Sequence, residues 1–242
     1  MKIALIGYGK MGKAIEIIAM ERNHEIVAKI DTNNQLEELL HVEVDVAIEF
    51  TRPDAAVGNI DFCIQHQIPV VVGTTAWYES YDAVVEKVNA ENGTLLTASN
   101  FSVGVNIFFQ INKVLARLMN SQEEYTPSIE EIHHLQKLDA PSGTAVTLAQ
   151  DLIKEVERVS TWKLGEEAHP NVFNNELAIT SYRLPDVPGT HVIKYQSEID
   201  TIEIKHEAHN RKGFALGAVL AAEFLKGKKG IFTMADVLKI EE

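Results

Sequence analysis

A glycine-rich turn follows the first apolar run of the chain and restricts the fold more than any other feature. Residues 3–6 are apolar, residues 7–12 read Gly-Tyr-Gly-Lys-Met-Gly, and residues 13–21 continue with helical periodicity. A strand, a glycine turn and a helix in this order are typical of a dinucleotide-binding unit. The first glycine permits the tight turn, the second lets the backbone approach a pyrophosphate, and the third lets the helix pack closely on the strand. We therefore predict that a dinucleotide cofactor contacts Gly7, Tyr8, Gly9, Lys10, Met11 and Gly12.

A second predicted strand, residues 25–30, ends at Asp31. In a dinucleotide-binding sheet, an acid near this position accepts hydrogen bonds from the adenosine ribose hydroxyls. The carboxylate also repels a 2′-phosphate, and Thr32 adds no compensating charge, so Asp31 favours NADH. Lys10 and Lys29 leave NADPH open as a second cofactor.

Strands and helices alternate through the rest of the first hundred residues. The expected strands are 44–50, 68–72 and 94–98, and the expected helices are 54–66 and 77–91. This alternation predicts a Rossmann-like, doubly wound parallel sheet. The helix expected over 214–225 and the segment 230–238 would complete it. The sequence thus predicts a discontinuous dinucleotide-binding domain of residues 1–103 and 212–242.

Residues 104–211 are predicted to form a second, α+β domain with a mostly open mixed sheet, which makes the whole chain α/β in class. A helix over 103–119 leads into it, and Ile129, Ile132 and Leu135 indicate a strand end or an edge segment. The rest of the domain is expected to contain a helix over 144–158, a loop over 159–175, and strands over 176–184, 191–197 and 200–208. The last strand alternates apolar and charged side chains, which predicts one buried face and one wet face.

The composition limits the compartment and the partners of the chain. Its formal net charge of −13 argues against a general affinity for nucleic acid or anionic membranes, both of which would repel it. Cys63 is the single cysteine, so no internal disulfide can form and a reducing compartment is expected. The first residues do not resemble a signal sequence, and no apolar run approaches the length of a membrane span. The sequence predicts a cytoplasmic protein that binds neither nucleic acid nor membrane.

Protonatable groups are concentrated between residues 130 and 145. His133 and His134 are adjacent, Lys137 follows, and Pro141-Ser142-Gly143-Thr144 forms a turn that opens a helix. Imidazole titrates near neutral pH and suits proton transfer, and lysine adds a positive charge. Backbone N–H groups at the start of a helix favour an anion such as a carboxylate. This stretch predicts a catalytic site for an organic acid.

Two other interpretations of the stretch stay open. The first is a strand end with surface histidines, followed by an ordinary helix start. The second is a metal site at the histidine pair. No acidic or cysteine ligand falls at a zinc spacing such as His-Glu-x-x-His, so no metal is expected.

Residues 133–145 contain every element of the pattern His-His-x-x-Lys-x-Asp-Ala-Pro-Ser-Gly-Thr-Ala. The chain thereby resembles the 4-hydroxy-tetrahydrodipicolinate reductases, also called dihydrodipicolinate reductases, over nearly its whole length. The resemblance implies reduction of (2S,4S)-4-hydroxy-2,3,4,5-tetrahydrodipicolinate to (S)-2,3,4,5-tetrahydrodipicolinate, with loss of water, by NADH or NADPH in the diaminopimelate route to lysine. It implies His133 and Lys137 as acid and base. It also implies that the substrate carboxylates are held by His134, Lys137, Gly143 and Thr144.

Other segments match the same family. The resemblance implies that the nicotinamide lies near Gly73, Thr74, Thr75, Ala98, Ser99, Asn100 and Phe101. Without it, these segments are two strand-to-helix turns. Arg211 belongs to a matching Arg-x-x-Phe-Ala-x-Gly-Ala run, either near the cofactor or simply in solvent. The family typically forms homotetramers through the second sheet, so residues 104–211 are expected to bind the dicarboxylate substrate and to oligomerise.

Two segments depart from the family pattern. The connection of residues 32–43 is shorter than in many relatives, which opens the adenosine pocket and bears on the cofactor preference. Residues 184–190 read Leu-Pro-Asp-Val-Pro-Gly-Thr, unlike the common glycine-rich version. Contacts made by this second loop, including those between subunits, are therefore expected to differ.

Two rival functions are weighed against the reductase. Another NAD(P)-dependent dehydrogenase of the same architecture, acting on an amino acid or a semialdehyde, needs the glycine turn and Asp31 but not His133, His134 and Lys137 together. A nucleotide-sensing regulator without catalysis needs a DNA-binding or partner-binding element. No basic helix-turn-helix pattern is visible, and the net charge is of the wrong sign for DNA.

Overall fold

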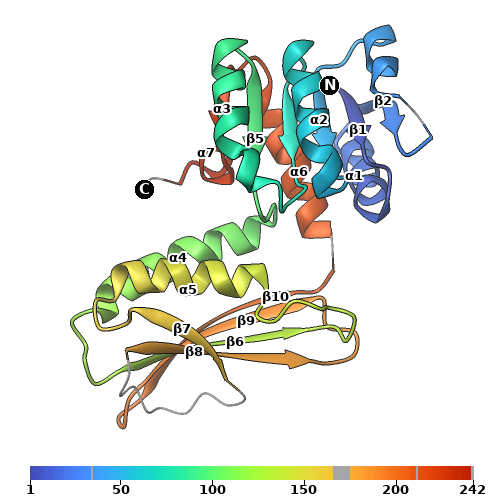
Figure 1. Cartoon of the computed structure of the whole chain (residues 1–242). Coiled ribbons are helices and arrows are strands. Elements are labelled where there is room, and N and C mark those ends of the chain that lie inside the picture. The colour runs from blue at the N-terminus through green and yellow to red at the C-terminus, as the bar shows by residue number, and fades with distance from the viewer. Residues whose placement is uncertain (34, 166–174, 211, 241–242) are drawn as a thin grey trace. The chain divides into compact units, whose positions relative to one another are not determined.

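The computed structural model describes residues 1–33, 35–165, 175–210 and 212–240. The chain divides into two compact units (Figure 1). Unit 1 comprises Met1–Val103 and Lys212–Glu242, and unit 2 comprises Gly104–Arg211. Each unit has a hydrophobic core of its own, so each is described by itself.

Unit 1 contains a six-stranded sheet in which every pairing is parallel. In spatial order its strands are β2 (Glu25–Ile30), β1 (Lys2–Ile6), β3 (Val46–Glu49), β4 (Val70–Val72), β5 (Thr94–Thr97) and β11 (Gly230–Phe232). The chain order reverses at β1, which has β2 on one side and β3 on the other. In such sheets, ligands bind at this switch point, beyond the carboxyl ends of the strands.

Helices cover both faces of this sheet, as Figure 1 shows. Alternate side chains of β1 enter different cores, with Leu5 in one and Ile6 in the other. The first core includes α1 (Lys10–Glu21), α6 (Lys212–Leu225) and α7 (Met234–Leu238), and the second includes η1 (Leu36–His41), α2 (Pro53–Gln65) and α3 (Tyr81–Ala90). The predicted doubly wound sheet is confirmed. The helix expected over 77–91 is shorter, because a 3-10 turn, η2 (Tyr78–Ser80), precedes α3.

Unit 2 contains a five-stranded mixed sheet with two helices on one face (Figure 1). Its strands, in spatial order, are β10 (Thr201–Ala208), β9 (Gly189–Gln196), β6 (Thr126–His133), β8 (Glu176–Arg183) and β7 (Thr161–Gly165). The helices are α4 (Val103–Met119) and α5 (Gly143–Glu155). The β6–β8 and β7–β8 pairs are parallel and the other two are antiparallel, which confirms the predicted mixed sheet.

Three local predictions in unit 2 are wrong. The loop expected over 159–175 contains β7, an edge strand with few buried side chains and hence no strand-like alternation; residues 166–174 lie outside the described part of the chain. The helix expected over 144–158 ends at Glu155. For the segment with Ile129, the edge alternative is wrong, because β6 is the middle strand of the sheet. The strand-end alternative is confirmed for Ile129 and Ile132, since β6 ends at His133, whereas Leu135 lies beyond it.

Among the described residues, no helix has the combination of length and apolar character needed to cross a membrane.

Candidate functional site

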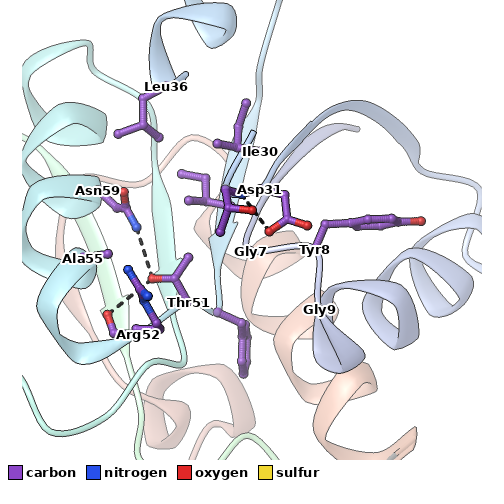
Figure 2. A pocket seen from close by; sticks show the side chains of 13 residues that line it. Gly7, Tyr8, Gly9, Ile30, Asp31, Leu36, Thr51, Arg52, Ala55 and Asn59 are labelled. Atoms are coloured by element: carbon purple, nitrogen blue, oxygen red, sulfur yellow. Dashed lines mark hydrogen bonds between the residues drawn. The ribbon is translucent and has the colours of Figure 1, made fainter. Parts of the chain in front are cut away.

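A pocket of about 400 Å³ opens in unit 1 beside the carboxyl ends of β1, β2 and β3. Figure 2 shows Arg52, Ala55 and Asn59 on one side of it and Tyr8 and Asp31 on the other. Its full lining is Ile6, Gly7, Tyr8, Gly9, Ile30, Asp31, Thr32, Leu36, Phe50, Thr51, Arg52, Ala55 and Asn59. The pocket therefore lies at the switch point of the sheet, where the glycine turn meets the acid that ends β2.

The three glycines of the turn have three different surroundings. Gly7 has a φ of +95°, and a Cβ placed on it would lie 2.0 Å from the carbonyl oxygen of Phe50. A Cβ on Gly12 would lie 2.3 Å from the carbonyl oxygen of Gly7, so α1 packs directly on the turn. A Cβ on Gly9 would meet nothing within 4 Å. The space in front of Gly9 is thus open to a ligand, whereas the other two glycines are required by the fold.

The amino end of α1 faces this turn without a side-chain cap. Gly9 is the N-cap residue, no side chain caps the helix, and its first turn contains no acid. Lys10 begins the helix, and Met11 packs against the core of unit 1. Unpaired N–H groups and the helix dipole make such an end a site for phosphate groups.

Asp31 is exposed at the end of β2, and its Oδ1 accepts a hydrogen bond of 2.8 Å from the backbone N–H of Thr32. Lys29, two residues earlier, lies 2.6 Å from Glu16 Oε1 and 4.7 Å from the centre of the Tyr8 ring. The hydrogen bonds that Lys29 donates to Glu16 and Tyr8 raise its pKa. Its ammonium group is therefore already paired within unit 1.

The opposite wall of the pocket is held by a buried carboxylate. Glu49, at the end of β3, is fully buried, and its Oε1 accepts hydrogen bonds from the Thr51 hydroxyl and from Asn59 Nδ2. The backbone N–H of Thr51 also donates to Thr74 Oγ1 at 2.8 Å. These contacts fix the turn between β3 and α2. Sequence reasoning noted this strand end but assigned it no site residue.

The segments expected near the nicotinamide follow β4 and β5 but do not line this pocket. A Cβ on Gly73 would lie 2.1 Å from the Phe50 ring, and that ring lies 5.7 Å from the Phe101 ring. Thr74 is buried, whereas Thr75 is exposed. Asn100 caps the next turn by accepting from the Ser102 N–H at 2.8 Å. The nicotinamide roles of residues 73–75 and 98–101 stay predictions, and Arg211 lies outside the described residues.

In unit 2, strand register brings a row of polar side chains together. Glu131 on β6 pairs with Ser181 on β8 and with His191 on β9, and His133 pairs with Arg183. Burial alternates along β6 so that Glu131 and His133 lie on the same face as buried Ile129. These polar groups thus belong to the face covered by the helices, at the end of β6.

Glu131 is the centre of this row. It is fully buried, its Oε2 forms an ion pair with His133 Nδ1, and its Oε1 accepts a hydrogen bond of 3.0 Å from Arg183 Nη2. Burial acts to raise the pKa of Glu131, but His133, Ser181 and Arg183 outweigh it and lower that pKa to about 2. The group is a carboxylate at every physiological pH.

His191 lies against His133 from the neighbouring strand, with their ring centres 5.1 Å apart. Its Nε2 is 3.0 Å from the hydroxyl of Ser142, the N-cap of α5, which also accepts from the Ala145 N–H. Burial, followed by the charge of His133, lowers the pKa of His191 to about 3. A neutral imidazole therefore joins the polar row to the amino end of α5, where Gly143 begins the helix.

The predicted residues after β6 lie in a turn next to this row. The N–H of Lys137 donates to the His134 carbonyl at 3.1 Å, and Lys137 Nζ contacts Asp139 Oδ1 at 2.8 Å. Arg183 donates to the carbonyls of Lys137 and Asp139 at 3.3 and 2.6 Å, which holds the turn against the strand. The structure thus brings His133 and Lys137 to the same end of the sheet.

One further chemical possibility follows from the donor atoms of the row. Glu131, His133 and His191 each offer one metal-ligand atom, and these atoms lie within 4.8 Å of one another. No metal site was predicted from the sequence, because the only ligand spacing compared was that near the histidine pair. His191 is distant from that pair along the chain. Arg183 already supplies a positive charge to the same carboxylate, which opposes a bound cation.

Sequence reasoning missed Glu131, Ser142, Arg183 and His191 as members of the site. The sequence did contain one indication of Glu131. Glu131 and His133 lie two and four residues after Ile129, so in a strand all three side chains share the buried face. A carboxylate and an imidazole at buried strand positions are uncommon without partners. The partners come from β8 and β9, whose register no local pattern gives.

Comparison with known proteins covers both units. A family model described as the N-terminus of dihydrodipicolinate reductase matches residues 1–101, and one described as the C-terminus of dihydrodipicolinate reductase matches residues 104–238. The match to the C-terminal family model thus extends over α6 and β11, which belong to unit 1.

Similar proteins cover the chain from end to end. It is 51% identical over 238 residues to the 4-hydroxy-tetrahydrodipicolinate reductase of Christiangramia forsetii, covering 98% of both chains. It is 33% identical over 241 residues to that of Thermosipho africanus, covering 99% of this chain and 98% of the relative. The solved dihydrodipicolinate reductase from Paenisporosarcina sp. TG-14, bound to dipicolinate, shares its fold with a TM-score of 0.81 at 23% identity over the whole of both chains.

Proposed function

The chain belongs to the dihydrodipicolinate reductase family, and from this premise we propose how its residues reduce 4-hydroxy-tetrahydrodipicolinate to tetrahydrodipicolinate. Unit 1 holds a nicotinamide dinucleotide, and unit 2 holds the dicarboxylate substrate. The observation that carries the proposal is the meeting of His133, Lys137 and the amino end of α5 at one end of the second sheet, because these groups supply a proton donor, a cation and an anion-binding helix end.

The pocket of unit 1 fits the cofactor at three points. The open space at Gly9 and the uncapped end of α1 suit the pyrophosphate, and Asp31 suits the adenosine ribose hydroxyls. Thr51, Arg52 and Asn59 form the wall opposite the ribose. When bound, the reduced nicotinamide supplies the hydride.

The residues of unit 2 supply the proton and hold the substrate. Loss of the 4-hydroxyl together with a proton from the neighbouring ring carbon releases water and leaves an unsaturated ring. Hydride addition to this ring leaves an electron pair on it, and His133 donates a proton to that pair. Lys137 exchanges its contact with Asp139 for a substrate carboxylate, or serves as a second proton source. His134 and the amino end of α5 at Gly143 and Thr144 bind the carboxylates.

We propose that NADH is preferred over NADPH. Asp31 would repel a 2′-phosphate, and Lys29, which could neutralise one, is paired with Glu16. Lys10 remains exposed at the start of α1, so NADPH is still used, with lower affinity.

We also propose a cytoplasmic homotetramer that assembles through the sheet face of unit 2 opposite α4 and α5. The free thiol of Cys63 is consistent with a reducing compartment. On the uncovered face, Glu130 pairs with Lys194 at 2.7 Å. Light scattering should give about four times the chain mass of 26.9 kDa.

The activity is tested by loss of NADH or NADPH absorbance, with the substrate generated in place from pyruvate and aspartate semialdehyde by a synthase. His133→Gln and Lys137→Ala should each lower kcat by roughly 10²–10⁴-fold, the contribution of general acid–base catalysis, and should leave cofactor binding intact. Exposed His41→Gln and Lys154→Ala are the matched controls. Protein that binds the cofactor but shows no turnover would instead support a dehydrogenase of the same architecture, to be screened on amino acids and semialdehydes.

A further inference from the structure

We infer that Glu131 is a positioning residue for the proton transfer: its carboxylate holds the His133 imidazole by Nδ1 and directs Nε2 to the substrate. This inference rests on the proposed function, in which His133 is the proton donor. It adds a buried acid, which begins the run of residues 131–145 that resembles the family signature, to the machinery of the reaction.

The geometry around the imidazole places one ring nitrogen of His133 against Glu131. Glu131 and His133 are two residues apart on β6, so their side chains leave the same face of the strand. Glu131 is fully buried and His133 is 8% exposed. The ion pair joins Glu131 Oε2 to Nδ1, which is itself a buried atom. One ring nitrogen is therefore committed to the protein interior.

The other ring nitrogen of His133 lies beside a glycine. A Cβ placed on Gly189, at the start of β9, would lie 3.0 Å from His133 Nε2. Any side chain at this position would therefore press on Nε2. The His133 side chain keeps 10% of its surface exposed, and the absence of a side chain at Gly189 leaves space beside the nitrogen that Glu131 does not hold.

The buried charge of the Glu131 carboxylate has a partner of opposite sign. Arg183 contacts Glu131 Oε1 and offsets the cost of burying its negative charge. The same guanidinium holds the carbonyls of Lys137 and Asp139. Glu131 and Arg183 thus join both proposed proton donors, His133 and Lys137, to the middle strand of the sheet.

The proton step balances with Glu131 in this role. The Nε2–H bond of the imidazolium breaks as the proton passes to the electron pair that hydride addition leaves on the substrate. The neutral imidazole that remains carries its proton on Nδ1, where Glu131 accepts it. Glu131 stays ionised throughout and fixes the tautomer, as an orienting carboxylate does for a catalytic histidine.

The experiment compares Glu131→Gln with Glu130→Gln. Glu130 is the adjacent residue of β6, points to the opposite face and also forms an ion pair, with Lys194. We expect Glu131→Gln to lower kcat by roughly 10–10³-fold, less than the loss of the proton donor itself, with little change in either KM. The pH profile of kcat should also change, because glutamine removes the charge beside the proton donor. Because Glu130 lies on the face proposed for assembly, light scattering first checks that Glu130→Gln keeps the mass of the parent protein, and this variant should then change neither quantity. Glu131→Asp should restore part of the loss seen in Glu131→Gln.

A spectroscopic measurement keeps the test independent of activity. With ¹⁵N-labelled histidine, the neutral His133 ring should show the proton on Nδ1 in the parent protein and a shift toward Nε2 in Glu131→Gln. Circular dichroism and cofactor binding check that the variant is folded. If His133→Gln is inactive while Glu131→Gln keeps its kcat, its pH profile and its tautomer, the positioning role is overturned and the reductase assignment stands. If His133→Gln keeps its activity, the proposed role of His133 itself fails.

Discussion

The two sites of this protein are built in opposite ways. The pocket of unit 1 is made largely by backbone, from Gly7, Gly9 and the end of β2 at Asp31, all near one another in sequence. The polar row of unit 2 is made by side chains, and Glu131 meets His191 only because β9 pairs with β6. A backbone site depends on local conformation and steric room, whereas a side-chain site depends on sheet register and buried charge. Different substitutions and conditions should therefore disrupt the site of unit 1 and the site of unit 2.

Added methyl groups should break unit 1 in two distinguishable ways. Gly7→Ala should lower the free energy of unfolding of unit 1 by about 3 kcal/mol, because it combines an unfavourable positive φ with a clash against Phe50. Gly9→Ala should leave stability nearly unchanged and weaken dinucleotide binding about tenfold or more, because its methyl group would enter open space near the pyrophosphate. Urea unfolding followed by Trp77 fluorescence, in a Trp162→Phe background, measures the first effect, and titration with NADH measures the second.

Equal loss of stability in both variants would contradict this division of roles. Gly58→Ala is the control, since a Cβ on this helical glycine of α2 also meets nothing within 4 Å and it does not line the pocket. It should raise the free energy of unfolding of unit 1 by up to about 1 kcal/mol, because alanine favours the helix over glycine, and it should leave the dinucleotide affinity unchanged.

Unit 2 should be the part of the chain that acid destabilises first. The pKa of His191 is about 3 in the folded protein against 6.5 ordinarily, so between these pH values only the unfolded chain binds the proton. Stability should fall as the pH is lowered from 6.5 toward 3, by at most about 1.4 kcal/mol per pH unit from this residue. Glu131, with its pKa lowered to about 2, adds a loss in the same direction only below pH 4.5.

Urea unfolding of Trp77→Phe protein at pH 7 and pH 5, followed by Trp162 in β7, measures this dependence. His191→Asn should flatten it. The groups that face His191 are His133, Glu131, His206 and Lys137, so the comparison is made against the parent protein at each pH. An unchanged slope in His191→Asn would assign the acid sensitivity to one of these neighbours.

The difference between the sites also explains what could be predicted. Periodicity and the glycine turn gave the parallel sheet, and Asp31 does line the pocket, because these features depend on residues close in sequence. The edge strand β7 was missed because a strand exposed on most sides needs no alternation. His133 was found by its chemistry, but Glu131 was not, because its role depends on Arg183 and His191 from other strands.

Asp31→Ser should change which cofactor unit 1 prefers without changing its fold, and it therefore tests the site of unit 1 alone. Removing the carboxylate loses hydrogen bonds to the ribose and relieves the repulsion of a 2′-phosphate, so the ratio of kcat/KM for NADPH to that for NADH should rise about tenfold, or about 1.4 kcal/mol. Steady-state kinetics with both cofactors measure it. Glu43→Gln, which removes an exposed charge paired with Lys2, is the control and should leave the ratio unchanged.

The smallest expected effect is that of metal removal, which separates the two chemical uses of the polar row. Glu131, His133 and His191 could together bind a metal ion, but in the structure Arg183 already neutralises the carboxylate and His133 is engaged through Nδ1. If the polar row serves proton transfer, dialysis against EDTA should leave kcat unchanged. Micromolar Zn²⁺ should then inhibit the enzyme, because it would bind His133 and His191. If turnover is lost in EDTA and Zn²⁺ restores it, the same three residues form a metal centre instead. The contact between Arg183 and Glu131 would then not explain how the charge of the carboxylate is balanced.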